Sequence, residues 1–295
     1  MKYKFLLYLF ILFLFILFLF INKNIESFNL KSNDFNDNIC CIYSYYEKNE
    51  LYKNNLKYFL DNGLLDNVDY YIIINGDCSI ELEKIKDMEN ITILYRENKG
   101  FDFGSYCYVL NNIIKKEYEY YFFINTSVRG PYLKNKSDKW TDLFIDLFYD
   151  DKIKVVGTTI NIHNPSSFEK DNLQKIYGNK DVFSHVQSMF FCIKHDYLVF
   201  LKNNNFFDCQ QINQQNMKYI ISFKEIGISQ NALNNGWNIN CIISKYRGLD
   251  YLTINENINN TSLEGDPYYK NAYFSETIDP YEVIFFKNSR FDIDK

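Results

Sequence analysis

The chain has 295 residues, a net charge of −5 and no dense block of Lys or Arg, which argues against nucleic acid as a partner. Hydrophobic residues make up 47% of the chain and aromatic residues 19%, which excludes a disordered protein. The length left after an apolar N-terminal segment is enough for one large α/β domain.

The N-terminal segment, residues 5–21, is a run of apolar residues preceded by Lys2 and Lys4. Its length is near the lower limit for crossing a bilayer. Because no small-residue cleavage site follows, we predict a retained transmembrane signal-anchor over residues 1–21, with a cleaved signal peptide as the alternative. The two lysines favour a single-pass, type II orientation in which the rest of the chain is lumenal or extracytoplasmic. Residues 22–36 are predicted to be a short stem.

Strands and helices then alternate with short connections. Apolar runs predict strands at 39–45, 68–75, 91–95, 120–124 and 154–160. Apolar residues at helical spacing predict helices at 50–62, 81–88, 105–116, 138–149, 195–201 and 228–234. This alternation predicts a mostly parallel sheet. We therefore expect residues 37–295 to form a single Rossmann-like α/β domain.

Two polar turns follow strands of this predicted sheet. One is the run 125–131 (NTSVRGP), and the other contains Asn98, Gly100, Asp102 and Gly104. Because glycine lacks a Cβ, the backbone of the second turn can approach a ligand closely or adopt a positive φ. Ligands of open α/β sheets bind at the carboxyl ends of the strands, so we expect Asp102 and Asn125 to lie at the same rim of the sheet.

Cysteine and asparagine patterns give weaker signals. The seven cysteines include no CxxC pair, and the three histidines form no cluster, so zinc is not suggested. One or two disulfides would fit a lumenal chain, but the sequence does not determine their pairing. Glycosylation sequons at Asn90, Asn135, Asn259 and Asn260 fit a secretory route, and Asn125 opens a further one inside the expected site.

The order of these motifs resembles the nucleotide-diphospho-sugar transferase (GT-A) fold of glycosyltransferases. The similarity is greater to glycosyltransferase-like proteins of the rhamnan-synthesis type, which carry N-x-G-x-D-x-G followed by L-N-x-S-V-x-G-P. The first motif is matched by Asn98, Gly100, Asp102 and Gly104, and the second by Asn125, Ser127, Val128, Gly130 and Pro131. The resemblance implies transfer of a hexosyl or deoxyhexosyl group from a nucleotide-sugar to a carbohydrate or glycoprotein acceptor.

The resemblance also assigns a donor site. It places the nucleotide-sugar against Asn98, Gly100, Asp102, Gly104, Asn125, Ser127 and Arg129. In metal-dependent members an Asp-x-Asp pair holds Mn²⁺ or Mg²⁺ against the diphosphate, whereas this chain has Asn125-Thr126-Ser127, which are poorer ligands. Three interpretations remain: Asp102 supplies charge to a metal, the enzyme works without one, or catalysis has been lost. Arg129 is interpreted either as a bidentate phosphate ligand or as a residue of a local ion pair.

Two downstream segments match the acceptor side of the resembling families. The segment 225–239 resembles E-D-x-x-L-S-x-x-L-x-x-x-G and places Glu225 where inverting members have their base. A carboxylate that stabilises the first turn of a helix is the alternative. His185, Gln187 and Ser188 are candidates for sugar contacts, although a purely structural hydrogen-bonding role fits His185 as well. The aromatic residues from 253 onward are expected to pack on the domain or to line the acceptor cleft.

Two other functions fit the same pattern. A non-catalytic carbohydrate-binding or membrane structural protein would keep the fold without the Asp-x-Asp pair. A nucleotidyltransferase on a related sheet would release pyrophosphate instead of a nucleoside diphosphate.

Overall fold

The computed structural model describes residues 38–290, so the predicted anchor (5–21) and stem (22–36) lie outside the described residues. Within residues 38–290, no helix combines the length and the apolar character that a bilayer crossing requires. The described residues from Ile39 onward belong to one compact unit.

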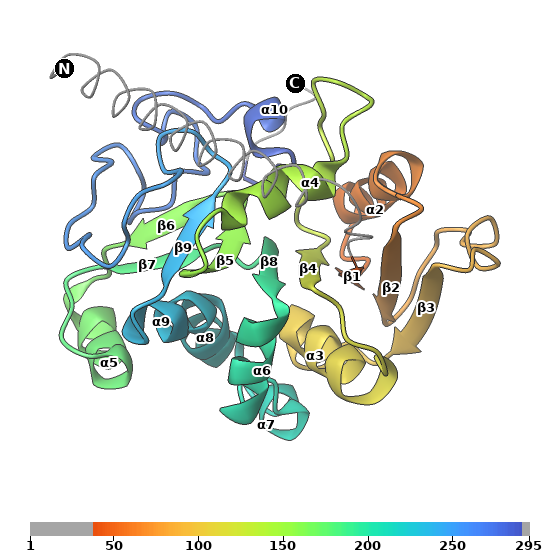
Figure 1. Ribbon diagram of the computed structural model, residues 1–295, viewed down its shortest axis with the longest axis horizontal. Helices are drawn as coiled ribbons and strands as arrows, with labels where there is room; N and C mark the ends of the chain where they lie inside the picture. The colour runs from red at the N-terminus through yellow and green to blue at the C-terminus, as the bar shows by residue number, and fades with distance from the viewer. Residues whose placement is uncertain (1–37, 291–295) are drawn as a thin grey trace, which may run out of the picture. The chain divides into compact units, whose positions relative to one another are not determined.

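A seven-stranded sheet has the order β3-β2-β1-β4-β8-β5-β9 (Figure 1). The strands β3, β2, β1 and β4 are parallel, β9 is parallel to β5, and β8 runs antiparallel between β4 and β5. Their bounds are β1 (Ile39–Tyr45), β2 (Val68–Asn75), β3 (Ile91–Arg96), β4 (Tyr120–Asn125), β5 (Ile153–Gly157), β8 (Phe190–Lys194) and β9 (Asn238–Cys241). The predicted α/β class with a mostly parallel sheet is confirmed.

The strand predicted at 154–160 is in fact two strands. After β5 the chain leaves the main sheet and forms β6 (Ile160–His163), which pairs antiparallel with β7 (Phe183–Val186). At the point of departure, a Cβ on Gly157 would collide with the Val186 side chain. Glycine therefore allows the two sheets to pack closely where the chain crosses between them.

Helices cover both faces of the main sheet (Figure 1). On one face lie α2 (Glu50–Asn62) and α4 (Trp140–Ile145), the latter continued by a 3₁₀ turn, η2 (Asp146–Phe148). On the other lie α3 (Phe101–Tyr108) with its π-helical continuation η1 (Val109–Ile113), α6 (His195–Asn203) and α9 (Ile226–Asn234). The remaining helices are α5 (Ser167–Tyr177), α7 (Cys209–Asn213), α8 (Met217–Tyr219), the π-helix η3 (Ile220–Glu225) and α10 (Pro280–Val283).

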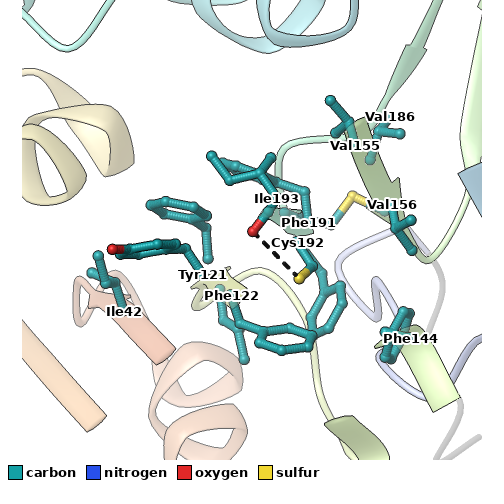
Figure 2. Close-up of a cluster of buried hydrophobic side chains, with 14 of the residues drawn as sticks. Ile42, Tyr121, Phe122, Phe144, Val155, Val156, Val186, Phe191, Cys192 and Ile193 are labelled. Atoms are coloured by element: carbon teal, nitrogen blue, oxygen red, sulfur yellow. Dashed lines mark hydrogen bonds between the residues drawn. The ribbon is translucent and has the colours of Figure 1, made fainter. Parts of the chain in front are cut away.

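Aromatic side chains of β4 join the helices to the sheet. Successive residues of a strand point to opposite faces. Phe122 accordingly packs on Trp140 of α4, and Phe123 packs on Tyr106 of α3, each with 5.0 Å between ring centroids. Figure 2 shows the core around these strands, where Phe122 lies beside its register partner on β8, Cys192. Burial on both faces explains why 120–124 is a continuous apolar run.

Two predicted helices differ clearly from the structure. Residues 81–88 form turns, because only Leu82 and Ile85 are buried and so short a segment needs more apolar contact to stay helical. The helix predicted at 105–116 begins at Phe101, directly after Gly100, whose φ of 72° reverses the chain. Asp102 and Gly104 are therefore in the first turn of a helix rather than in a loop.

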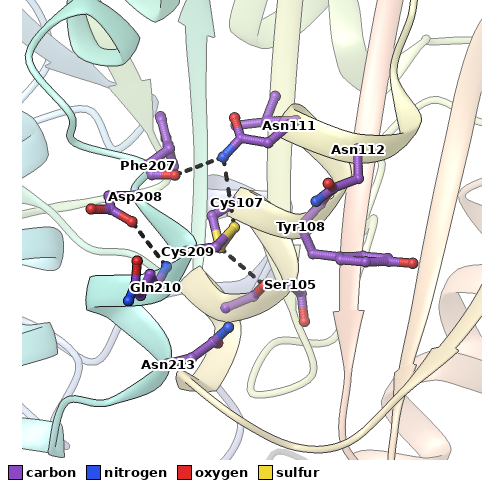
Figure 3. Close-up of a disulfide and its surroundings, with 12 residues drawn as sticks. Ser105, Cys107, Tyr108, Asn111, Asn112, Phe207, Asp208, Cys209, Gln210 and Asn213 are labelled. Carbon is purple, nitrogen blue, oxygen red and sulfur yellow. Dashed lines mark hydrogen bonds between the residues drawn. A yellow bond between two sulfur atoms is a disulfide. The ribbon is translucent and has the colours of Figure 1, made fainter.

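One disulfide lies within the described part of the chain, between Cys107 of α3 and Cys209 of α7 (Figure 3). It joins residues 102 positions apart and ties α7 to the helix that carries Asp102. The other five cysteines are free, and all of them except Cys78 are buried. A buried thiol behaves as a small hydrophobic group, so these cysteines contribute to the core.

Two of the sequon asparagines have side chains that are engaged inside the folded chain. The amide nitrogen of Asn90 donates to the carbonyl oxygens of Leu65 and Val68. Asn259 is fully buried, and its amide nitrogen donates to the hydroxyl of Tyr246. A glycan attached at either nitrogen would break these hydrogen bonds, so neither amide is placed for glycosylation in the folded protein. The sequons at Asn135 and Asn260 are exposed.

Candidate functional site

A cavity of about 380 Å³ opens at the carboxyl rim of β1, β2 and β4. Six of the residues singled out from the sequence line it: Asn98, Asp102, Asn125, Ser127, Ser188 and Glu225. They come from the turn before α3, the first turn of α3, the end of β4, the turn before β8 and the end of η3. Segments that are distant in the sequence therefore converge where open α/β sheets bind ligands.

The two polar turns meet through a side-chain hydrogen bond. The Nδ2 of Asn125 donates to Oδ2 of Asp102 at 2.8 Å, and Oδ1 of Asp102 accepts from the backbone N–H of Phe103 at 3.0 Å. Asp102 and Asn125 therefore lie at the same rim of the sheet, as expected.

The carboxyl group of Asp102 lies in an unusual electrostatic environment. Burial raises its pKa to about 6, and the charge of Glu225 acts in the same direction, while the hydrogen bond from Asn125 acts against both. The charge of Glu225 thus acts on Asp102 across the same cavity.

The second polar turn is closed on itself. The Oδ1 of Asn125 accepts from the backbone N–H of Ser127 at 3.0 Å and from its hydroxyl at 2.6 Å. The hydroxyl of Thr126, the residue between Asn125 and Ser127, accepts a hydrogen bond from the backbone N–H of Tyr46 at 3.2 Å. This bond fixes the turn against the end of β1. The oxygen is the only atom of the Asn125 side chain that could bind a hard cation, and it already accepts two hydrogen bonds within the turn.

A partly buried polar network holds the turn before α3. Arg96, the last residue of β3, donates from Nη1 to Oδ1 of Asn75 at 2.8 Å and from Nη2 to the carbonyl oxygen of Lys99 at 2.9 Å. The hydroxyl of Ser105 donates to the same oxygen of Asn75 at 3.0 Å. Asn98 is thereby placed at the cavity by contacts to the ends of β2 and β3.

The glycines of this turn shape the backbone and do not line the cavity. A Cβ on Gly100 would lie 2.6 Å from Oδ1 of Asn213 in α7, and a Cβ on Gly104 would collide with the carbonyl oxygen of Lys99. Gly100 has the positive φ that the sequence allowed. Close packing within the protein, and not close approach to a ligand, accounts for both residues.

Glu225 lies inside a long helical run. Helix α8, η3 and α9 are continuous from Met217 to Asn234, and Glu225 has helical angles (φ −63°, ψ −60°) at the junction of the last two. The interpretation of Glu225 as a first-turn residue that stabilises the helix dipole is therefore wrong. The same run lines the cavity with Met217, Ile220 and Ile221.

Only one of the three predicted acceptor-side residues lines the cavity. Ser188 does so, but His185 is buried and its Nδ1 lies 2.8 Å from the carbonyl oxygen of Phe183. Burial lowers the pKa of His185, which favours its neutral form. Gln187 is also buried and accepts from the hydroxyl of Thr159 at 2.6 Å. His185 and Gln187 have structural roles here, which corrects the expectation of sugar contacts.

Arg129 is likewise not among the residues that line the cavity. Its Nε donates to Oδ1 of the buried Asn55 at 3.1 Å. The basic side chains at the cavity are instead Lys48, in the connection from β1 to α2, and Lys287, near the C-terminus. Sequence reasoning missed both lysines, because they lie outside the recognised motifs.

The side chains present do not form a protein cage for a divalent cation. Within residues 38–290, no group of three or more His, Cys, Asp or Glu side chains is arranged to hold a metal. The position of the Asp-x-Asp pair is occupied by the closed turn of Asn125 and Ser127. The carboxylates of Asp102 and Glu225 are the acidic side chains that line the cavity.

No protein-family model and no curated protein matches this chain. A mannosyltransferase from Pyrobaculum calidifontis, solved with GDP-mannose and Mn²⁺, has a similar structure, with 10% identity and a TM-score of 0.41. The match covers 68% of this chain and 53% of the mannosyltransferase, so this chain spans about half the length of that protein. Core-mannan synthase A from Aspergillus fumigatus, in its Mn/GDP form, is similar over 85% of this chain and 83% of its own, with 8% identity and a TM-score of 0.40. A galactosyltransferase in complex with donor and acceptor sugar analogues is similar over 68% and 70%, with 9% identity and a TM-score of 0.37.

Proposed function

We propose that this chain is a glycosyltransferase that moves a sugar from a nucleotide-sugar donor to a carbohydrate or glycoprotein acceptor. The observation that carries the proposal is the convergence of Asp102, Asn125 and Glu225 on one cavity at the carboxyl rim of a mostly parallel sheet. The resemblance of the turns at 98–104 and 125–131 to glycosyltransferase motifs supports the same activity.

The cavity contains groups suited to both halves of the reaction. Glu225 acts as general base and removes the proton of an acceptor hydroxyl as its oxygen attacks the anomeric carbon of the donor. Asp102 is held by Asn125 and accepts hydrogen bonds from the donor. Aromatic rings at the cavity offer stacking surfaces for a nucleobase or a sugar; these are Tyr46, Tyr52 and Phe101.

The proposal includes a cellular location. Residues 5–21 would anchor the chain as a type II, single-pass membrane protein with the catalytic part lumenal or extracytoplasmic. The disulfide between Cys107 and Cys209 supports an oxidising compartment, because disulfides form and persist there.

A non-catalytic carbohydrate-binding protein is the second candidate. The observation that favours it is the closed turn of Asn125 and Ser127 where metal-dependent enzymes carry two carboxylates. Such a protein would bind a nucleotide-sugar or a glycan without turnover.

Incubation of the purified full-length chain with a panel of nucleotide-sugars and glycan acceptors separates these functions. A glycosyltransferase releases a nucleoside diphosphate in an acceptor-dependent manner. Binding without release favours the non-catalytic alternative. A parallel incubation with nucleoside triphosphates and sugar 1-phosphates would identify a nucleotidyltransferase by release of pyrophosphate. A chain that binds none of the nucleotides or nucleotide-sugars would overturn the site assignment.

A further inference from the structure

Two basic residues that belong to no recognised motif meet at the cavity. Lys48 follows β1 by three residues, and Lys287 lies in a segment more than 230 positions later in the chain. Both line the same cavity as Asp102 and Glu225. Within residues 38–290, neither lysine forms an ion pair, whereas Lys154, for example, pairs with Asp196. Both ammonium groups are therefore available to an anionic ligand.

The position of Lys287 is fixed by its two neighbours. The backbone of Phe286 exchanges two hydrogen bonds with that of Arg129, at 2.9 and 2.8 Å. The side chain of Asn288 exchanges two more with that of Asn55, at 3.0 and 2.8 Å. Phe286 and Asn288 are both buried, whereas Lys287 between them is partly exposed and lines the cavity. Because the residues on either side of Lys287 are buried and hydrogen-bonded, its side chain is held at the rim beside the turn of Asn125.

Arg129 takes part in this arrangement as a structural residue. It pairs with Phe286 through its backbone and with Asn55 through its side chain. Asn55 in turn donates to the carbonyl oxygen of Thr126 at 2.9 Å. The arginine that the sequence suggested for phosphate binding thus fixes the segment that presents a different cation, Lys287.

We propose that Lys48 and Lys287 bind the diphosphate of the donor and stabilise the leaving nucleoside diphosphate, in place of a divalent cation held by the protein. When the anomeric carbon–oxygen bond breaks, its electron pair passes to the diphosphate oxygen. Nearby ammonium groups stabilise that added charge, and the acceptor proton passes to Glu225. The inference rests on the proposed function and explains how the cavity works with the Asn125–Ser127 turn in place of an acidic pair.

Binding of UDP, GDP and dTDP to the full-length chain, measured by calorimetry in EDTA and again in Mn²⁺, tests the inference. For the nucleotide that binds, affinity in EDTA should stay within about threefold of that in Mn²⁺. Lys287→Met and Lys48→Met should each weaken binding about tenfold or more, the effect of losing one charge-assisted contact. Lys57→Met, which removes an exposed lysine of α2 away from the cavity, should leave affinity unchanged.

Further measurements distinguish a charge effect from a folding defect. Lys287→Arg keeps the charge and should retain most of the affinity. The matching nucleoside, which lacks phosphates, should bind the wild type and Lys287→Met equally. Binding only in Mn²⁺, or no loss in either lysine variant, would overturn the inference while leaving sugar transfer intact. Failure of all nucleotides to bind under both conditions would instead overturn the proposed function.

Discussion

The amide nitrogen of Asn125 donates to the carboxylate of Asp102 at 2.8 Å and so joins the end of β4 to the first turn of α3. The opposite atom of the same amide, Oδ1, accepts from the backbone and the hydroxyl of Ser127. These contacts fix which way the amide faces, because a reversed group would set an oxygen against a carboxylate. Asparagine at this position therefore serves as a hydrogen-bond donor that an aspartate could not replace while ionised.

The raised pKa of Asp102 predicts a pH-dependent stability. Because its pKa is about 6 in the folded chain, above the ordinary value, the folded protein binds this proton more tightly than the unfolded one. The contribution of Asp102 to stability is greatest below about pH 4 and is lost as the pH rises through about 6. Urea denaturation across this range should show the wild type losing on the order of 2 kcal/mol relative to Asp102→Asn. Parallel pH profiles of the two proteins would contradict the assignment.

Replacement of Glu225 should separate binding from chemistry. Glu225→Gln keeps the shape of the side chain but cannot accept the acceptor proton, so kcat should fall by about 10²- to 10⁴-fold. Affinity for the nucleoside diphosphate should not decrease, because the proposed base does not hold the donor. Glu256→Gln, at an exposed position away from the cavity, is the matched control. Unchanged kcat in Glu225→Gln would remove this residue from the mechanism.

The packing of Gly104 predicts a local stability defect. In Gly104→Ala the new Cβ meets the backbone carbonyl of Lys99, which cannot move without displacing the turn that carries Asn98. We expect a loss of about 3 kcal/mol in unfolding free energy. Gly76→Ala is the control, because Gly76 has a positive φ but a Cβ added there would meet no atom within 4 Å, so about 1 kcal/mol is expected. A loss in Gly104→Ala no larger than that in Gly76→Ala would contradict the expected collision with the Lys99 carbonyl.

The disulfide predicts that α7 supports the turn before α3. Cys209→Ser releases a link that closes 102 residues and should lower the unfolding free energy by about 2 to 4 kcal/mol. It should also weaken nucleotide binding, because Asn213 of α7 packs against Gly100 and accepts from Arg96. Cys78→Ser, at a partly exposed free cysteine, should have neither effect. Denaturation with and without a dithiol reductant provides the measurement: only the proteins that keep the disulfide should respond to the reductant.

The sheet was largely predictable because its strands are apolar on both faces. The runs at 68–75 and 120–124 are buried strands with the expected bounds to within a residue. The placement of Asp102 and Asn125 followed from the same rule, since both turns follow strands of one parallel sheet. The fold was less predictable where helices are polar: α5 and α7 are held by tertiary contacts and carry few buried residues of their own.

The cavity was only partly predictable, because sequence neighbours need not share an environment. His185 and Ser188 are three residues apart, yet His185 is committed to the β7 backbone and Ser188 reaches the cavity. Lys287 lies far from every motif, and the contacts of Phe286 with Arg129 and of Asn288 with Asn55 bring it to the rim. A local pattern predicts a strand or a turn, but it does not reveal a contact between distant segments.

The pairing of Phe286 with Arg129 also affects the order in which the site can mature during synthesis. A nascent chain that has emerged only as far as α10 already contains every strand of the sheet, both carboxylates and both halves of the disulfide. It still lacks the ammonium group of Lys287 and the amide of Asn288 that braces Asn55. Tight binding of a nucleoside diphosphate should therefore begin only after Lys287 and Asn288 have emerged. Shorter translation intermediates should bind it weakly, however well their sheet has formed.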